Sequence, residues 1–308
     1  MPEETNGWWP ADPTPADVKR GYYLRELFGQ TEFVVLGPWT SKVEDAVLSE
    51  TFDMLALNYA LGFQARDLDF LDGLPVRSIA VLARTISNIE GLYRVPNLQR
   101  LQLTSGAREL DCDRLPYLRS LSAEWSEITR SIRYVSRDLE ELWAGDYAEQ
   151  DLAPLPELPR LTSLGAKGRV RLETLDGLAE ISHNLAKLYV ASGTRLQDVT
   201  GLAEVSATLV DLDIEDAKKV ADWSPAMRCQ KLEQLQLSEC GKISTLRGIE
   251  RATGLTRVDL HGSTTITDGD LTYLLRLPRL EDLRLVNRRH YVPSTREVRQ
   301  VHGITGWL

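Results

Sequence analysis

The chain has 308 residues, of which 43% are hydrophobic and 26% are charged, and its formal net charge is −9. This composition provides enough apolar material for a sizeable core and argues against wholesale disorder. The acidic balance argues against broad binding to nucleic acid, because surfaces that neutralise phosphate groups are usually basic.

The chain begins with MPEETNGWWPADPTP, which has no basic region followed by an apolar run, so we expect no signal peptide. The longest apolar stretches, such as FVVLGPW at residues 33–39, are far too short to span a bilayer. The three cysteines, Cys112, Cys229 and Cys240, have no zinc-binding spacing and fit a reducing compartment better than a disulfide framework. We therefore expect a soluble, cytoplasmic protein.

Residues 1–50 are predicted to form an N-terminal capping segment. Thr14 followed by Pro15 is typical of a helix start and Gly29 of a helix end, which predicts a helix over about residues 15–28. Residues 31–39 are expected to add a leading strand. The apolar side chains expected to cover the first unit of the following region are Val18, Tyr22, Leu24 and Leu27, and packing is also the preferred role of Trp8 and Trp9.

From residue 51 the sequence repeats itself. An apolar residue is followed at +3 and +5 by two more, and the next copy starts 20 to 25 residues later. The eleven copies start at Phe52, Val76, Leu98, Leu118, Leu139, Leu161, Leu185, Leu209, Leu232, Leu255 and Leu280. Apolar residues at spacing three in the second half of a copy predict a short helix or 3₁₀ segment. This period predicts a solenoid of about 11 units over residues 51–287.

The last segment, residues 288–308, is predicted to be a C-terminal capping helix and tail. Ser294 and Glu297 form a capping box, so the helix is expected to run to about His302, with Gly303 after it. The basic stretch NRRH at residues 287–290 is expected to be a solvated turn. The side chains expected to close the last repeat are Val298, Val301, Ile304, Trp307 and Leu308.

The L-x-x-L-x-L pattern, as in LVDLDI at 209–214 and LEQLQL at 232–237, resembles the leucine-rich-repeat family over about residues 50–287. The resemblance implies an α/β fold: a curved solenoid with a parallel sheet on its concave face, short helices or 3₁₀ segments on its convex face, and two caps. The family usually carries Asn or Cys after the strand to tie down the turn, and here only Cys240 fits. We expect backbone or water contacts to hold the other turns, and Cys240 to be buried rather than reactive.

Side chains alternate along a strand, so the residues between the leucines should line the concave face. Asp211, Asp213 and Glu215 would then share that face and repel one another. Parallel pairing should place Asp211 between Lys187 and Gln234, Asp213 between Tyr189 and Gln236, and Glu215 between Ala191 and Ser238. The predicted partner-binding residues are Trp143, Tyr189, Lys187, Asp211, Asp213, Glu215, Arg257, Asp259, His261 and Arg284.

Two simpler interpretations of this surface stay open. The charges can form a solvated face that Lys187 and Arg257 partly neutralise, in which case each exposed pair contributes about 0–1 kcal/mol. Trp143 can pack sideways against a neighbouring irregular repeat instead of contacting a partner. Exposed aromatic residues and arginines are nevertheless the usual types that dominate binding energy, which favours a recognition surface.

Motifs of catalysis are missing from the sequence: it has no P-loop, no dinucleotide-binding glycine motif and no nucleophile elbow. Asp259 and His261 would lie about 7 Å apart on one strand, with no nucleophile opposite. TDGDL at 267–271 resembles a calcium loop only in its first residues, so Asp268 or Asp270 is expected to cap the next helix. We predict no catalytic residue, no metal and no cofactor.

Concave sheets of the resembled family commonly bind proteins. We therefore expect a monomeric, non-catalytic protein–protein interaction module, a bacterial adaptor or an inhibitor of the immunity-protein type. Its partner is expected to be a protein with a basic patch, and neither nucleic acid nor a membrane. The alternatives are a structural assembly protein whose ends stack into oligomers, and an enzyme subunit with a concave-face site near Asp259 and His261.

Overall fold

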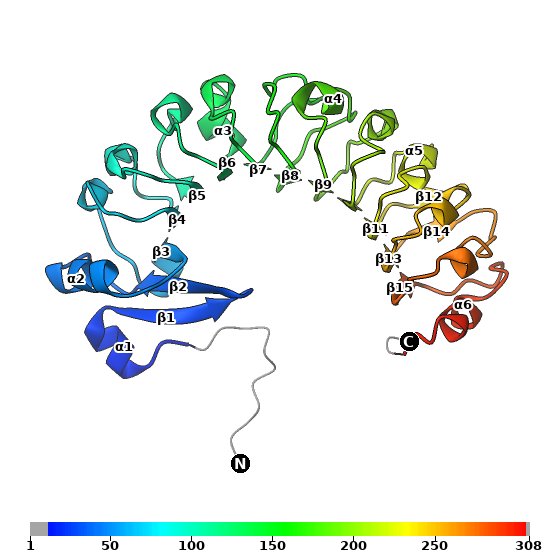
Figure 1. Ribbon diagram of the computed structural model, residues 1–308, viewed down its shortest axis with the longest axis horizontal. Coiled ribbons are helices and arrows are strands. Elements are labelled where there is room, and N and C mark those ends of the chain that lie inside the picture. The colour runs from blue at the N-terminus through cyan, green and yellow to red at the C-terminus, as the bar shows by residue number, and fades with distance from the viewer. Residues whose placement is uncertain (1–11, 306–308) are drawn as a thin grey trace, which may run out of the picture. The chain divides into compact units, whose positions relative to one another are not determined.

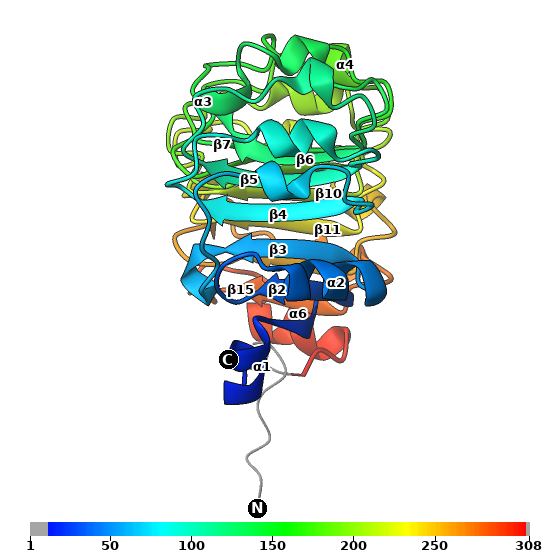
Figure 2. The same ribbon diagram turned by 90° about the vertical axis from the view of Figure 1, so that its left-hand side faces the viewer.

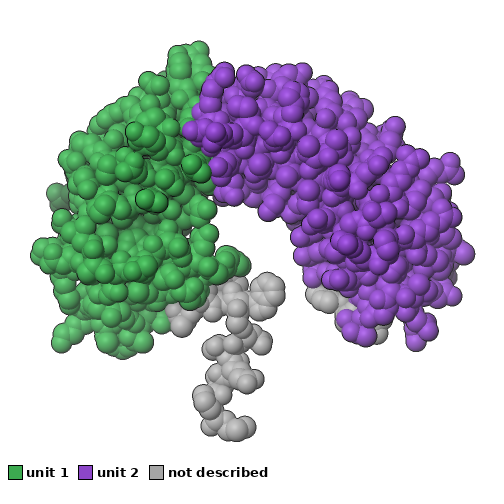
Figure 3. All heavy atoms as spheres, viewed as in Figure 1, with its two compact units in different colours: residues 1–136 green, residues 137–308 purple. Residues whose placement is uncertain are grey.

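A computed structural model describes residues 12–305, so Trp8, Trp9, Trp307 and Leu308, with their expected packing roles, lie outside the described residues. The chain divides into two compact units, Met1–Ser136 and Arg137–Leu308 (Figure 3). The predicted repeat region therefore contributes to both units. No helix within residues 12–305 is long and apolar enough to cross a membrane.

Unit 1 has one antiparallel hairpin, β1 with β2, followed by parallel pairing from β2 through β6. Figure 2 shows β3, β4 and β5 side by side. Its elements are α1 (Pro15–Arg20), β1 (Tyr22–Leu27), β2 (Gln30–Val35), α2 (Ser41–Ser49), β3 (Met54–Asn58), β4 (Ser78–Ala83), β5 (Arg100–Ser105), β6 (Ser120–Glu124) and α3 (Trp125–Ile128).

Unit 2 has a parallel main sheet in the order β7-β8-β9-β10-β11-β13-β15, and a two-stranded sheet of β12 and β14. Its elements are β7 (Glu141–Gly145), β8 (Ser163–Lys167), α4 (Leu178–Ile181), β9 (Lys187–Val190), β10 (Asp211–Glu215), α5 (Ser224–Met227), β11 (Gln234–Ser238), β12 (Lys242–Ile243), β13 (Arg257–Leu260), β14 (Thr265–Ile266), β15 (Asp282–Leu285) and α6 (Thr295–Val301).

The core of each unit lies between its strands and its short helical segments. Within each unit the main-sheet strands line the inner side of the curve, and most helices and 3₁₀ segments lie on the outer side (Figure 1). The repeat leucines point into this layer: Leu209, Leu212 and Ile214 are all fully buried. The 3₁₀ segments are Tyr59–Leu61, Asp69–Leu71, Glu90–Arg94, Cys112–Arg114, Ile132–Tyr134, Thr200–Ala203, Ile249–Arg251 and Leu274–Arg276.

The turns that follow β7, β8, β9, β10, β11 and β13 share a left-handed backbone. The residues with positive φ at these turns are Asp146, Gly168, Ser192, Asp216, Glu239 and Gly262. Backbone hydrogen bonds link successive turns; for example, the Asp216 N–H donates to the Ser238 carbonyl oxygen at 3.0 Å. The Cys240 sulfur lies 3.3 Å from the Ile214 carbonyl oxygen, as the resemblance implies for this position. Backbone groups thus hold turns that lack the family's usual Asn or Cys.

The helical side has a recurrent polar position that the leucine spacing does not reveal. A side-chain oxygen there accepts a hydrogen bond from the backbone N–H two residues later and closes a local turn. The residues that do so are Asp67, Asn88, Asp111, Asp151, Thr174, Asp198, Asp222, Thr245 and Asp270. Asp268 and Asp270 form such turns ahead of the 3₁₀ segment Leu274–Arg276, but its N-cap is Tyr273 and has no side-chain cap, so the capping expected of Asp268 or Asp270 is wrong.

The N-terminal cap differs from the predicted helix over residues 15–28. Helix α1 ends at Arg20, because Gly21 adopts a left-handed backbone (φ 92°) and closes the helix. The next residues form the β1–β2 hairpin, in which Tyr22 stacks on Phe33 at 4.6 Å between ring centroids. Val18 is 58% exposed and does not cover the first repeat. The strand expected at 31–39 is present in part as β2, which ends at Val35 and follows β1.

The C-terminal cap follows the prediction more closely. The Ser294–Glu297 capping box is present, α6 ends at Val301, and Gly303 has a left-handed backbone. Val298 is fully buried, but Val301 is 66% exposed, so its expected role in closing the last repeat is wrong.

We expect all three thiols to be inert in the folded chain. Cys112, Cys229 and Cys240 are free and buried, and burial raises their pKa to about 11, about 12 and about 12. A chromogenic disulfide reagent at pH 8 should therefore titrate fewer than one thiol in the native chain and all three after denaturation. Rapid reaction of one native thiol would contradict this prediction.

Candidate functional site

The sheet side of unit 2 brings several of the predicted residues into one row. Register pairs Trp143 of β7 with Gly165 of β8, Gly165 with Tyr189 of β9, and Tyr189 with Asp213 of β10. Asp211 pairs with Lys187 and with Gln234, as predicted, so the expected strand register is confirmed. We call the surface formed by Trp143, Tyr189, Asp211, Asp213 and Glu215 the acidic–aromatic face.

An aromatic pair forms one half of this face. The Trp143 ring stacks on the Tyr189 ring with centroids 5.1 Å apart and planes 20° apart. The stack crosses the intervening strand β8 because Gly165 has no side chain: a Cβ there would lie 2.3 Å from Trp143 Cε3. Trp143 therefore packs on Tyr189 across Gly165 and stays half-buried on the sheet surface. The leucine spacing gave no signal for Gly165.

Three carboxylates form the other half. The Tyr189 hydroxyl donates to Asp211 Oδ2 at 2.7 Å, and Gln236 Nε2 donates to Glu215 Oε1 at 3.2 Å. Asp213 lies between them, half-buried, and its buried Oδ1 has no hydrogen-bond partner among the described residues. Burial, and then the Glu215, Asp211 and Asp259 carboxylates, raise the pKa of Asp213 to about 7, although Arg257 opposes the shift.

Asp213→Asn should stabilise the fold in a pH-dependent way. The folded pKa of about 7 lies above the unfolded value of 3.8, so between these pH values the native state holds a proton that the unfolded chain has lost. The free energy of unfolding therefore falls as the pH rises from about 4 to about 7, because the native state must then give up this proton at a cost. The gain should be near zero below pH 4 and about 1–3 kcal/mol above pH 7.

Urea unfolding at several pH values measures this gain. The charged and titratable groups around the carboxyl are Lys187, Tyr189, Asp211, Glu215, Arg257 and Asp259. Asp176→Asn, an exposed change on the helical side, is the matched control and should shift stability by less than about 0.5 kcal/mol. An Asp213→Asn gain that is equal at pH 4 and pH 8 contradicts the prediction.

Four of the other predicted residues, Arg257, Asp259, His261 and Arg284, form an adjoining ion-pair cluster, whereas Lys187 lies beside Asp211 in the strand register. Asp259 is 1% exposed, so it is a buried carboxylate and not the surface residue that alternation suggested. Arg257 and Arg284 lie 3.7 and 3.6 Å from its Oδ2, and His261 Nδ1 lies 2.5 Å from its Oδ1. Asp282, which the sequence did not single out, also pairs with both arginines. These partners give Asp259 a structural role.

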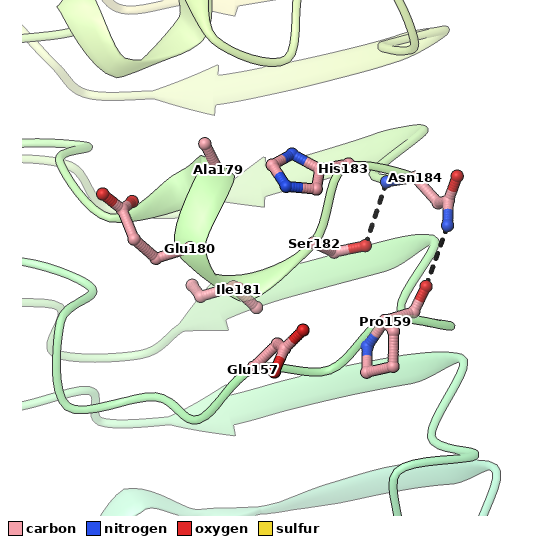
Figure 4. A pocket seen from close by; sticks show the side chains of 8 residues that line it. All are labelled: Glu157, Pro159, Ala179, Glu180, Ile181, Ser182, His183 and Asn184. Carbon is pink, nitrogen blue, oxygen red and sulfur yellow. Dashed lines mark hydrogen bonds between the residues drawn. The ribbon is translucent and has the colours of Figure 1, made fainter.

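Two hollows of unit 2 lie away from the acidic–aromatic face. One, of about 430 Å³, lies beside α4, with Glu157, Glu180 and His183 among its lining residues (Figure 4). There Asn184 Nδ2 donates to the Pro159 carbonyl at 2.8 Å. No three His, Cys, Asp or Glu side chains gather to hold a metal ion in the described part of the chain. The other, of about 540 Å³, lies between β15 and α6.

Comparisons with known proteins identify the fold. No protein-family model matches the chain, and no curated protein matches it. Among solved structures it is similar to an internalin (InlF) from Listeria monocytogenes, with 21% sequence identity and a TM-score of 0.56 over 82% of this chain and 73% of that chain. At this identity the likeness shows the fold alone, and the fold is the leucine-rich-repeat solenoid predicted from the sequence.

Proposed function

We propose that the chain is a non-catalytic protein-binding module whose acidic–aromatic face takes a lysine or arginine of a partner protein. The observation that carries this proposal is Asp213, whose pKa is raised to about 7 by burial and crowded carboxylates. A cation placed among these carboxylates would relieve their repulsion. The Trp143–Tyr189 stack beside them offers a rigid aromatic surface for the carbon chain or guanidinium of that residue.

The fold suits this role because stacked repeats present a preorganised surface, so little ordering free energy is lost on binding. A standard protein interface buries about 1,200–2,000 Å² in total, of which this face would be the centre. Aromatic residues and desolvated charge pairs at an interface centre usually dominate its affinity.

A random-peptide library selected against the whole chain tests the proposal without knowledge of the partner. Peptides rich in lysine or arginine should be enriched, and they should bind the Asp211→Lys/Asp213→Lys variant at least 100-fold more weakly, which corresponds to about 2.7 kcal/mol. Asp176→Lys/Glu180→Lys, the same charge change at two exposed positions on the helical side, should bind them normally. Enrichment of acidic peptides, or equal binding to the two variants, would overturn the proposal.

The finer roles of adaptor and inhibitor rest on the same face. An adaptor would hold a second protein while the first is bound, whereas an inhibitor would block its partner's activity, so co-purification and an activity assay of the partner separate them.

A cytoplasmic location is proposed from the three free, buried thiols. A monomer is proposed, and light scattering at high concentration tests it against stacking into oligomers.

The enzyme alternative near Asp259 and His261 is the weaker one. A general base needs a carboxylate or imidazole that can reach substrate. Asp259 is buried, and only the half-exposed His261 ring could reach a substrate. The second oxygen of Asp259 is held by Arg257 and Arg284. This arrangement favours a charge cluster that holds β13 and β15 in register over a catalytic pair.

A further inference from the structure

The C-terminal end of unit 2 is basic although the chain as a whole is acidic. Between residues 284 and 302 there are five arginines and one acidic residue, which gives a formal charge of +4 in a chain of −9. The acidic residue, Glu297, is already bound: the backbone N and hydroxyl of Ser294 donate to its Oε2 at 2.8 and 2.7 Å. Its charge therefore serves to start α6.

Three of these arginines, Arg284, Arg296 and Arg299, line the hollow between β15 and α6, and Arg284 is already ion-paired with Asp259 and Asp282. Its volume is about 540 Å³, within the range of sites that hold small molecules. Leu285 and Val286 supply apolar wall, and Val286 is 45% exposed. The polar residues around it are His261, Arg284, Asn287, Thr295, Arg296 and Arg299. We call this hollow the basic cap pocket.

The polar groups of the pocket are mainly hydrogen-bond donors. Asn287 Oδ1 accepts from Thr295 N at 3.0 Å, which leaves the Asn287 amide NH₂ as a donor. His261 turns Nδ1 toward Asp259, so its Nε2 is the ring nitrogen left for the pocket. Arg296 is exposed on α6. Arginine guanidinium groups bind carboxylate and phosphate through paired N–H donors.

We propose that the basic cap pocket binds a small organic anion, a carboxylate or phosphate group on an apolar body. The arginines Arg296 and Arg299 bind the anionic group, and the apolar body lies against Leu285 and Val286. This site is separate from the acidic–aromatic face and opposite to it in charge. It does not depend on the proposed partner, so either proposal can fail alone.

Titration of the full chain with a matched set of probes, followed by calorimetry or NMR, tests the pocket. Hexyl phosphate and hexanoate carry the two candidate head groups on one apolar body, and at least one should bind saturably. Hexanol and hexylammonium should not bind, and inorganic phosphate should bind at least 10-fold more weakly than hexyl phosphate. The ratio of the hexyl phosphate and hexanoate affinities identifies the preferred head group.

Variants then locate the site. Arg296→Gln and Arg299→Gln should each weaken binding about 10-fold, because each removes one charge-assisted donor. Arg279→Gln, an exposed arginine at the same end of the chain but outside the pocket, should bind as the unaltered chain does. The Asp211→Lys/Asp213→Lys variant should also bind normally. Equal binding of hexylammonium, unchanged binding in the Arg296→Gln/Arg299→Gln double variant, or no saturable binding of either anion overturns the proposal.

Discussion

Asp259→Asn is expected to destabilise the fold by about 2–3 kcal/mol, because it removes a buried charge that two partly exposed arginines and His261 contact. The change keeps the shape of the side chain but removes the charge that Arg257 and Arg284 share. Two guanidinium groups would then face each other on β13 and β15 without the buried carboxylate between them. Denaturant unfolding at neutral pH measures the loss.

Asp282→Asn is the matched control for this change. Asp282 pairs with the same two arginines, at 3.5 and 3.3 Å, but its side chain is 38% exposed. Exposed pairs contribute little, so this variant should lose at most about 1 kcal/mol. Asp259→Asn should also lower the pKa of Asp213, because the Asp259 carboxylate helps to raise it. Equal losses in the two variants would contradict a buried charge at Asp259.

Gly91→Ala is expected to destabilise unit 1 by about 3 kcal/mol, the upper range for overpacking. Gly91 lies in the 3₁₀ segment Glu90–Arg94, against the segment of the preceding repeat. A Cβ at this position would lie 1.7 Å from the Leu68 carbonyl oxygen and 2.5 Å from the Leu68 carbonyl carbon. Since both atoms belong to the backbone, no side-chain rotation relieves the clash and the two repeats must move apart.

Two other glycines make this experiment specific. Gly201 of unit 2 has the same environment, with a Cβ position 2.2 Å from the Leu175 oxygen, and its replacement by alanine should be similarly harmful. At Gly254 the nearest atoms to a Cβ are at 3.7 Å, so Gly254→Ala should change stability by less than about 0.5 kcal/mol. Similar urea midpoints for Gly91→Ala and Gly254→Ala would show that the repeats yield to the extra carbon.

The candidate site illustrates why strand register is predictable and side-chain environment is not. The spacing of Leu209, Leu212 and Ile214 fixes which face Asp211 and Asp213 share, because alternation is a local property of the chain. The stack of Trp143 on Tyr189 depends on what lies between them on β8, a residue 22 positions from Trp143 in the sequence. Burial of Asp259 depends likewise on Arg257, Arg284 and His261.

The sequence by itself determined the repeat period, the strand register and the two-sided layering of strands and short helices, because each follows from apolar spacing within one repeat. It also located the Ser294–Glu297 cap. Only the tertiary structure decided that residues 22–27 form a hairpin strand and not a helix, since β1 is stabilised by pairing with β2. It likewise decided the raised pKa of Asp213 and the existence of the basic cap pocket, because both arise from side chains that several repeats bring together.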